Sequence, residues 1–147
     1  MKISSLLLLS HLFLITNCHH KTTAIENLPS GKNDLSQLNA TWELKQLEGE
    51  NYTTSETTKK IELQIKTALN EFTGNDGCNR IFGNLTRLDT QSLVFGTMAS
   101  TRMACEKMAL SSYYTKLLKK VRSFSVTATE LKLVNEAGVI ILYFTKK

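Results

Sequence analysis

The sequence predicts an α+β domain, mainly of antiparallel strands, in which a curved sheet or incomplete barrel is accompanied by one late helix. Three observations support this fold class. Short segments alternate apolar and polar residues, turn signals rich in glycine and asparagine separate them, and one segment near residues 106–120 has helical period. The connections between the predicted strands are mostly hairpin-like, which favours antiparallel pairing.

A leader precedes the predicted domain. Residues 1–17 begin with Met1 and Lys2 and continue in an almost wholly apolar run up to Ile15. This run is too short to cross a bilayer, which takes about 20 apolar residues. Its length and flanks are typical of a secretory signal peptide. The alternative is a buried helix of the domain.

The segment that follows is polar. Residues 18–39 contain the only proline, Pro29, followed by Gly31, Asn33 and Asp34. This composition predicts a flexible tether, whose ends would lie roughly 25 Å apart as a coil. Its histidines, His19 and His20, are interpreted as part of a solvated tail rather than as a metal site.

The domain is expected to occupy residues 40–147. Residues 41–45 and 60–66 alternate cleanly and predict two strands with one apolar face each. The segment 70–74 leads into an Asn-Asp-Gly turn, because these residues tolerate the left-handed backbone of tight turns. Two further strands are expected around 83–87 and 92–98.

One late segment has the spacing of a helix. Leu110, Tyr114, Leu117 and Val121 are separated by four, three and four residues, which places them in one stripe on a helix over about 106–120. We interpret the stripe as core packing against the sheet, with ligand contact as the alternative. Strands at 123–126, 131–133 and 139–144 follow, and residues 135–138 form the last hairpin turn.

Charge limits the range of partners. Cleavage after residue 17 would leave 130 residues, enough for one domain, with 17 basic and 13 acidic side chains and a net charge of +4, because Lys2 is the only charge removed. The basic residues are scattered and belong to no recognised nucleic-acid module, so nucleic acid is not an expected partner. A solvated surface is the simplest interpretation, and attraction to anionic lipid headgroups is the alternative.

The first cysteine lies in an export motif. The segment Leu14-Ile15-Thr16-Asn17-Cys18 resembles the lipobox of bacterial lipoproteins, with Asn17 where a smaller residue is usual. The resemblance implies cleavage before Cys18 and its acylation, and more than one acyl chain gives stable membrane anchoring. Simple secretion, with Cys18 discarded or oxidised, is the alternative.

With Cys18 assigned to lipid, Cys78 and Cys105 remain as an even pair in an oxidising compartment. A disulfide between them would close a loop of about 28 residues and contribute about 3.5 kcal/mol in the chain-entropy model. Two buried free thiols are the alternative.

The sequence predicts no catalytic residue, metal site or cofactor. All three histidines lie before residue 40, so the domain lacks the base of Ser-His and Cys-His catalysis and the commonest neutral metal ligand. No phosphate-binding or dinucleotide-binding loop occurs. Asp76 and Asn79 are interpreted as turn-forming residues. Arg80 and Arg102 are interpreted as a solvated pair, with a small basic patch as the alternative.

Two blocks carry a family resemblance. They are Gly74-x-x-Gly77-Cys78-Asn79-x-x-x-Gly83 and Met98-Ala99-x-Thr101-x-Met103-Ala104-Cys105, preceded by Trp42-x-Leu44 and followed by Leu117 and a Leu-x-Leu hairpin. In this order they resemble the META domain family, which includes the HslJ-like heat-shock lipoproteins, over about residues 40–146. The motif residues that the resemblance marks as structural are Trp42, Gly74, Gly77, Asn79, Gly83, Met98, Ala99, Thr101 and Met103.

The resemblance implies an incomplete-barrel α+β fold, envelope association, links to stress response and novobiocin tolerance, and no established catalytic activity. We therefore expect a non-enzymatic, monomeric lipoprotein on the periplasmic face of the outer membrane, acting in stress tolerance or in binding an envelope protein. An alternative is a carrier of an acyl chain or apolar peptide, like secretion-pilot lipoproteins, which requires a cavity beside the helical stripe. A hydrolase or redox enzyme is a further alternative, and would need a carboxylate pair in a cleft or reduced cysteines.

Overall fold

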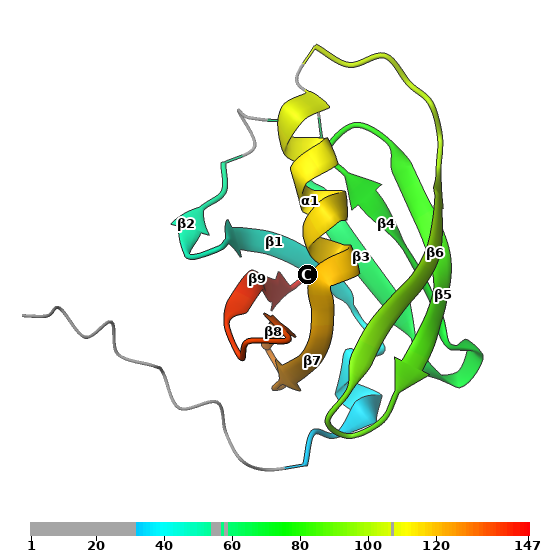
Figure 1. Cartoon of the computed structure of the whole chain (residues 1–147), viewed down its shortest axis with the longest axis vertical. Helices are drawn as coiled ribbons and strands as arrows, with labels where there is room; N and C mark the ends of the chain where they lie inside the picture. Colours follow the sequence, from blue (N-terminus) through cyan, green and yellow to red (C-terminus); the bar gives the residue numbers. More distant parts are fainter. Residues whose placement is uncertain (1–31, 54–56, 58, 107) are drawn as a thin grey trace, which may run out of the picture.

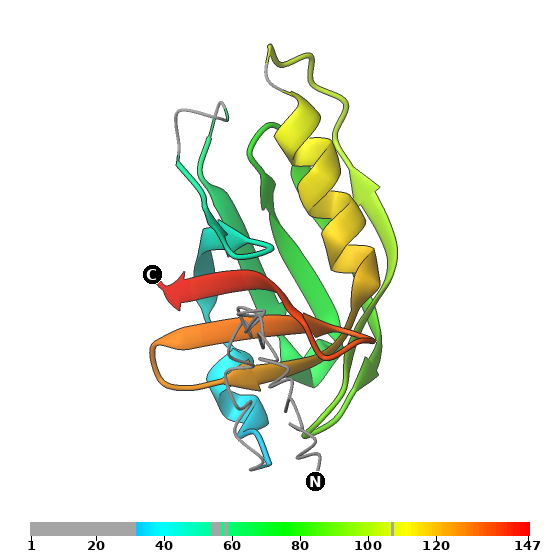
Figure 2. The same cartoon turned by 60° about the vertical axis from the view of Figure 1, so that its left-hand side comes forward.

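A nine-stranded antiparallel sheet curves into a barrel with one open seam, and a single α-helix lies against it (Figures 1 and 2). The structure, a computed structural model, describes residues 32–53, 57, 59–106 and 108–147. The predicted signal peptide, Cys18 and most of the predicted tether lie outside the described residues. In chain order the elements are η1 (Leu35–Leu38), β1 (Thr41–Leu47), β2 (Glu50–Asn51), β3 (Ile61–Lys66), η3 (Thr67–Leu69), β4 (Glu71–Asp76), β5 (Arg80–Leu88), β6 (Leu93–Ser100), α1 (Met108–Lys120), β7 (Val121–Val126), β8 (Glu130–Asn135) and β9 (Ile140–Lys146).

The strand order is β6-β5-β4-β3-β1-β9-β8-β7, and β2 pairs with β1 off this path. The first strand therefore lies in the middle of the sheet, between β3 and the last strand, β9. The seam lies between the end strands β6 and β7. In the described part of the chain an isolated bridge between Ser92 and Ser123 joins its two sides. The fold class predicted from the sequence is confirmed.

Asn33 closes the seam near this bridge. Its Nδ2 donates to the carbonyl oxygens of Thr90 (2.9 Å) and Phe124 (3.0 Å), and its Oδ1 accepts from the backbone N–H of Val126 (3.0 Å). The side-chain amide thus takes the place of a peptide group on the free edge of β7, and links that edge to the turn between β5 and β6.

The domain includes residues before the boundary expected at residue 40. The carboxylate of Asp34 caps η1 by accepting from the backbone N–H of Ser36 at 2.9 Å. Leu38 is fully buried, and its carbonyl accepts from the indole Nε1 of Trp42 at 3.1 Å. The end of the predicted tether is therefore part of the domain, because Leu38 lies in the core and Leu35 packs against it.

Strand alternation builds most of the core, as predicted. Trp42 and Leu44 of β1, and Ile61, Leu63 and Ile65 of β3, all point inward and are buried. Fully burying an aliphatic or aromatic side chain of this size contributes about 1.5–3 kcal/mol. These two central strands therefore anchor the sheet, and their other faces are left to polar residues.

The predicted helix is present, with described bounds Met108–Lys120. The face of α1 that meets the sheet carries the fully buried Tyr114, Leu117 and Leu118, and Leu110 packs against the same core. The helix runs along the concave side of β4 and β6 and leads directly into β7 (Figure 2). The hydroxyl of Tyr113, on another face of α1, donates to the carboxylate of Glu48 after β1.

Candidate functional site

The two segments that the sequence singles out meet beside a disulfide. Cys78 and Cys105 are bonded, with their Cα atoms 6.1 Å apart. Cys78 is buried and Cys105 is half-buried in the loop between β6 and α1. The disulfide expected from the cysteine count is therefore present, and it ties this loop to the turn between β4 and β5.

The turn itself is built by Asp76. Its buried carboxylate oxygen Oδ1 accepts from the backbone N–H groups of Cys78 (2.9 Å) and Asn79 (2.6 Å). Gly77, which lies between Asp76 and Cys78, has a φ of +94°, and a Cβ there would lie 2.5 Å from Cγ2 of Thr57. The turn thus requires glycine at position 77 for both its backbone and its packing.

Asn79 forms a second, non-covalent link between the segments. Its Oδ1 accepts from the backbone N–H of Met103 (2.8 Å) and from the hydroxyl of Thr101 (3.2 Å). The Thr101 hydroxyl oxygen in turn accepts from the backbone N–H of Arg80 (3.1 Å). We call Asn79, Thr101 and Met103 the Asn79 clamp. The clamp gives a physical reason for three of the motif positions.

The remaining motif residues have structural positions around the clamp. Trp42 is in the core, and Gly74 pairs with Leu63 across β3 and β4. A Cβ at Gly83 would lie 2.3 Å from the carbonyl oxygen of Thr97, so glycine permits the close approach of β5 and β6. On β6, Met98 is half-buried opposite Gly83, and the exposed Ala99 pairs with Phe82.

A groove of about 540 Å³ opens beside the clamp on the outer face of β4 and β5. Its lining residues are Glu71, Phe72, Thr73, Arg80, Phe82, Gly83, Asn84 and Thr101. Both motif blocks contribute, since Gly83 belongs to the first and Thr101 to the second, while Arg80 and Phe82 occupy unspecified positions within the first block. The motif therefore shapes a surface depression as well as a turn.

The groove was missed by sequence reasoning, although a signal for it exists. Ile81 and Leu85 of β5 are buried, so the residues between them in alternation face outward. Phe82 stands in this outward phase and is 48% exposed. An aromatic residue in the solvent phase of a strand is the pattern that could have identified this surface.

The interior of the barrel is packed with side chains. Phe72 meets Phe95 edge-on with ring centroids 4.9 Å apart, and Tyr114 of α1 meets Phe144 in the same way at 6.4 Å. Burial, together with the nearby carboxylate of Asp76, raises the pKa of Tyr114 above its usual range, so its hydroxyl stays protonated. The groove lies on the outer face, away from the stripe beside which a carrier would need its cavity.

Within the described ranges, no three His, Cys, Asp or Glu side chains gather closely enough to hold a metal ion. Among the same residues no helix has the length and apolar character needed to span a bilayer.

Fold and site together define a small, disulfide-tied α+β domain built on an incomplete antiparallel barrel, whose turn, clamp and groove lie together on one face.

The chain belongs to the META domain family, whose family model matches residues 34–147. This match begins at Asp34, the residue that caps η1, so it includes the helical turn that precedes β1.

Solved structures share this fold. A protein from Burkholderia xenovorans, determined by NMR, is 26% identical, with a TM-score of 0.58 over 74% of this chain and 82% of that one. A second NMR structure is 23% identical, with a TM-score of 0.55 over 73% and 89%. A DUF4847 family protein from Bacteroides vulgatus is 11% identical, with a TM-score of 0.53 over 75% and 94%. A search of curated protein sequences finds no significant match.

Proposed function

We propose that this protein is a non-enzymatic lipoprotein, anchored in the cell envelope through acylated Cys18, whose META domain binds an envelope partner through the groove beside the Asn79 clamp. The observation that carries the proposal is the convergence of both motif blocks on one surface depression that exposes an aromatic ring. The resemblance to HslJ-like lipoproteins suggests that such binding would serve tolerance of envelope stress.

The groove has the chemistry of a protein-binding surface. Aromatic and arginine side chains provide most of the binding energy in many interfaces, and the groove contains one of each in Phe82 and Arg80. Its volume of about 540 Å³ suits a few side chains of a partner. The disulfide and the clamp hold the loop that bears Thr101, so this rim of the groove is ordered before a partner arrives.

Two features support the proposed location in the cell envelope and the proposed lack of catalytic activity. A disulfide between Cys78 and Cys105 is typical of an oxidising compartment, which agrees with export. The domain has no histidine, and aromatic side chains pack against one another inside the barrel, where a carrier would need its cavity. These features favour surface recognition over the carrier and enzyme alternatives.

The experiment is crosslinking and affinity capture of the intact, anchored protein from its own envelope. Phe82→Ala removes the exposed ring, and Val139→Ala, which changes a 53% exposed residue in the last hairpin, serves as the matched control. We expect wild type and Val139→Ala to capture the same protein and Phe82→Ala to lose it. Equal capture by Phe82→Ala would refute the groove as the binding site. Mass analysis of the mature N-terminus tests acylation of Cys18 separately.

A further inference from the structure

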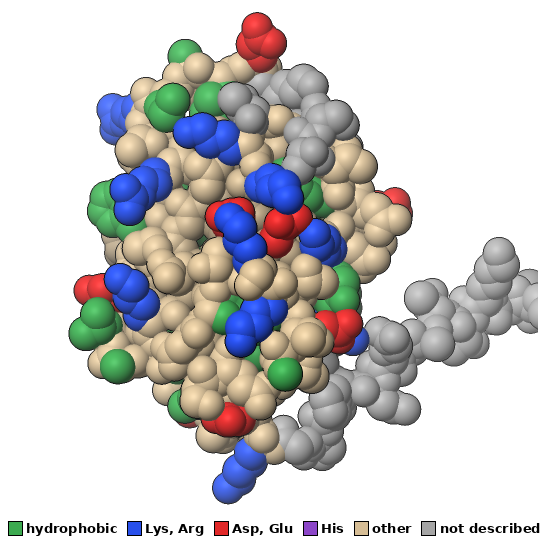
Figure 3. All heavy atoms as spheres, turned by 180° about the vertical axis from the view of Figure 1, so that it is seen from behind, with side chains coloured by type: hydrophobic (Ala, Val, Ile, Leu, Met, Phe, Trp, Pro, Cys, Tyr) green, Lys and Arg blue, Asp and Glu red, His purple; other side chains and the backbone are tan. Residues whose placement is uncertain are grey.

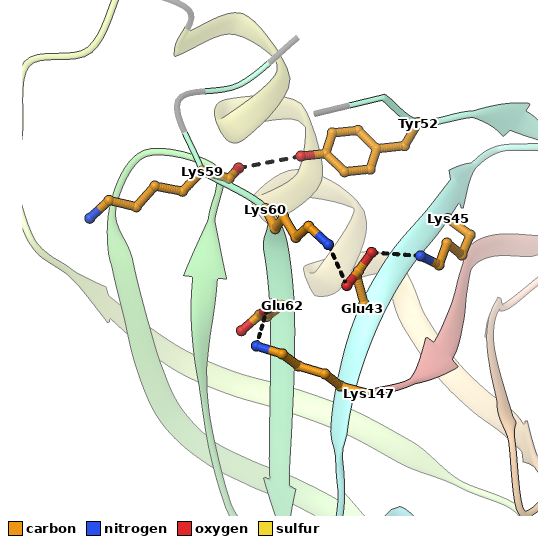
Figure 4. A network of polar contacts seen from close by, with 7 residues as sticks. All are labelled: Glu43, Lys45, Tyr52, Lys59, Lys60, Glu62 and Lys147. Carbon is orange, nitrogen blue, oxygen red and sulfur yellow. Dashed lines mark hydrogen bonds and ion pairs between the residues drawn. The ribbon is translucent and has the colours of Figure 1, made fainter. Parts of the chain in front are cut away.

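The outer face of β1 and β3 carries a layer of lysines above two glutamates. Lys45 and Lys60 bind the two carboxylate oxygens of Glu43, at 2.6 and 3.0 Å, and Lys147 binds Oε1 of Glu62 at 2.9 Å (Figure 4). We call Lys45, Lys60 and Lys147 the lysine layer. Three ammonium groups thus share two carboxylates on a single face of the sheet.

The two kinds of charge lie at different depths. The side chains of Lys45, Lys60 and Lys147 are 41%, 54% and 58% exposed. Those of Glu43 and Glu62 are only 17% and 26% exposed. A partner approaching this face therefore meets the ammonium groups first, and the carboxylates beneath hold them in place.

Each ammonium group retains donors for a partner. An ammonium carries three N–H groups, and each lysine of the layer donates one of them to its glutamate. Lys45 and Lys60 lower the pKa of Glu43, and Glu62 raises the pKa of Lys147, so these pairs stay ionised near neutral pH. The remaining donors suit phosphate oxygens.

Further lysines extend the positive surface. Lys59 and Lys66, at the two ends of β3, are exposed and form no ion pair within the described residues. Glu71 of β4 stands opposite Lys66 in the register of β3 and β4, and Glu130 lies farther away on β8, which pairs with β9. Figure 3 shows basic side chains gathered on the side turned away from α1, with acidic ones set among them near its centre.

This face lacks the anchors of a protein interface. The large apolar side chains that are exposed in the described chain are Leu69, Phe82, Met103, Met108, Tyr113 and Val139. None of them belongs to β1 or β3. Protein interfaces usually bury aromatic or apolar anchors at their centre, whereas a bilayer surface presents anionic groups without pockets.

We propose that the lysine layer docks the domain flat on a bilayer by binding anionic phospholipid headgroups. This contact goes beyond the acyl anchor and the groove, since it uses a different face and needs no lipid on Cys18. It would orient a tethered domain with α1 directed away from the membrane.

The test uses the chain from residue 18 onward with Cys18→Ser, which contains every described residue and cannot be acylated. Cosedimentation is measured with phosphatidylcholine vesicles, with and without phosphatidylglycerol. The layer variant carries Lys45→Gln, Lys60→Gln and Lys147→Gln. The matched control carries Lys116→Gln, Lys119→Gln and Lys120→Gln on α1, all exposed, and so loses the same net charge. Arginine at the three layer positions keeps the charge.

We expect binding only to vesicles that contain phosphatidylglycerol, with release at high salt because the contact is electrostatic. The layer variant should lose at least about tenfold in apparent affinity, while the α1 control and the arginine variant retain binding. Equal losses in the layer and α1 variants would overturn the proposal in favour of net charge alone. No binding, or equal binding to neutral vesicles, would also overturn it. Displacement by soluble glycerol phosphate at matched phosphate concentration would instead indicate a free-anion site.

Discussion

Replacing Asn33 with alanine should open the seam of the barrel. The substitution removes three hydrogen bonds of 2.9–3.0 Å that link the turn after β5 to the edge of β7. A buried or half-buried hydrogen bond contributes about 1 kcal/mol net. Because the freed backbone groups of β7 lie at an edge and can bind water, we expect a loss of about 2 kcal/mol rather than 3. For a domain of this size that lowers Tm by roughly 8 °C.

Urea unfolding and native-state amide exchange measure this effect at two levels. The N–H of Val126 donates to Asn33, so its exchange should accelerate by at least about tenfold in Asn33→Ala. Asn33→Asp can still accept from Val126 but cannot donate to the two carbonyls, so it should lose at least as much stability as the alanine variant. Lys32→Ala, an exposed neighbour, is the control and should change stability by less than about 0.5 kcal/mol. An unchanged unfolding free energy and unchanged Val126 exchange in Asn33→Ala would refute the reasoning.

Three further predictions concern the core, the disulfide and pH. Replacing Cys78 and Cys105 by serine should cost about 3.5 kcal/mol in urea unfolding, since a loop with a sequence separation of 27 is no longer closed in the unfolded chain; a loss below about 1 kcal/mol would contradict this. Tyr114→Phe should leave stability unchanged or raise it by about 1 kcal/mol, because the buried hydroxyl has no hydrogen-bond partner among the described residues; a clear loss in thermal melting would show that the hydroxyl is satisfied. Two neighbouring lysines lower the pKa of Glu43, so its ionised form stabilises the folded state. Wild type should therefore exceed Glu43→Gln in unfolding free energy above the usual glutamate pKa of about 4.3, and this advantage should vanish as the pH falls below that value. A difference in unfolding free energy that stays constant across acid pH would exclude this linkage.

Local patterns predicted most of the strands and the helix correctly. Alternation in 41–45 and 60–66 identified β1 and β3, because each has one buried and one solvated face. The helical stripe identified α1, although Leu118 was left out of it and is fully buried. The beginning of the domain was not predictable in this way, since η1 has one buried residue and no period.

The site depends on contacts that no local pattern encodes. Asn79 binds residues 22 and 24 positions further along the chain, and Asn33 binds one 91 positions away. Such pairings follow from the register of β5 with β6 and from closure of the sheet. The cysteine count was an exception, because two cysteines in a pair have only one possible partner each.

The place of β1 determines when the domain can fold. This strand lies early in the chain, yet one of the strands that it pairs with is β9, which ends at Lys146. Until β9 arrives, β1 has an unpaired edge, and Phe144, opposite Leu44, is missing from the interior. The sheet is therefore completed only after the last strand has been synthesised. A growing chain stays open until then, and its unpaired strand edge remains exposed to chaperones and proteases.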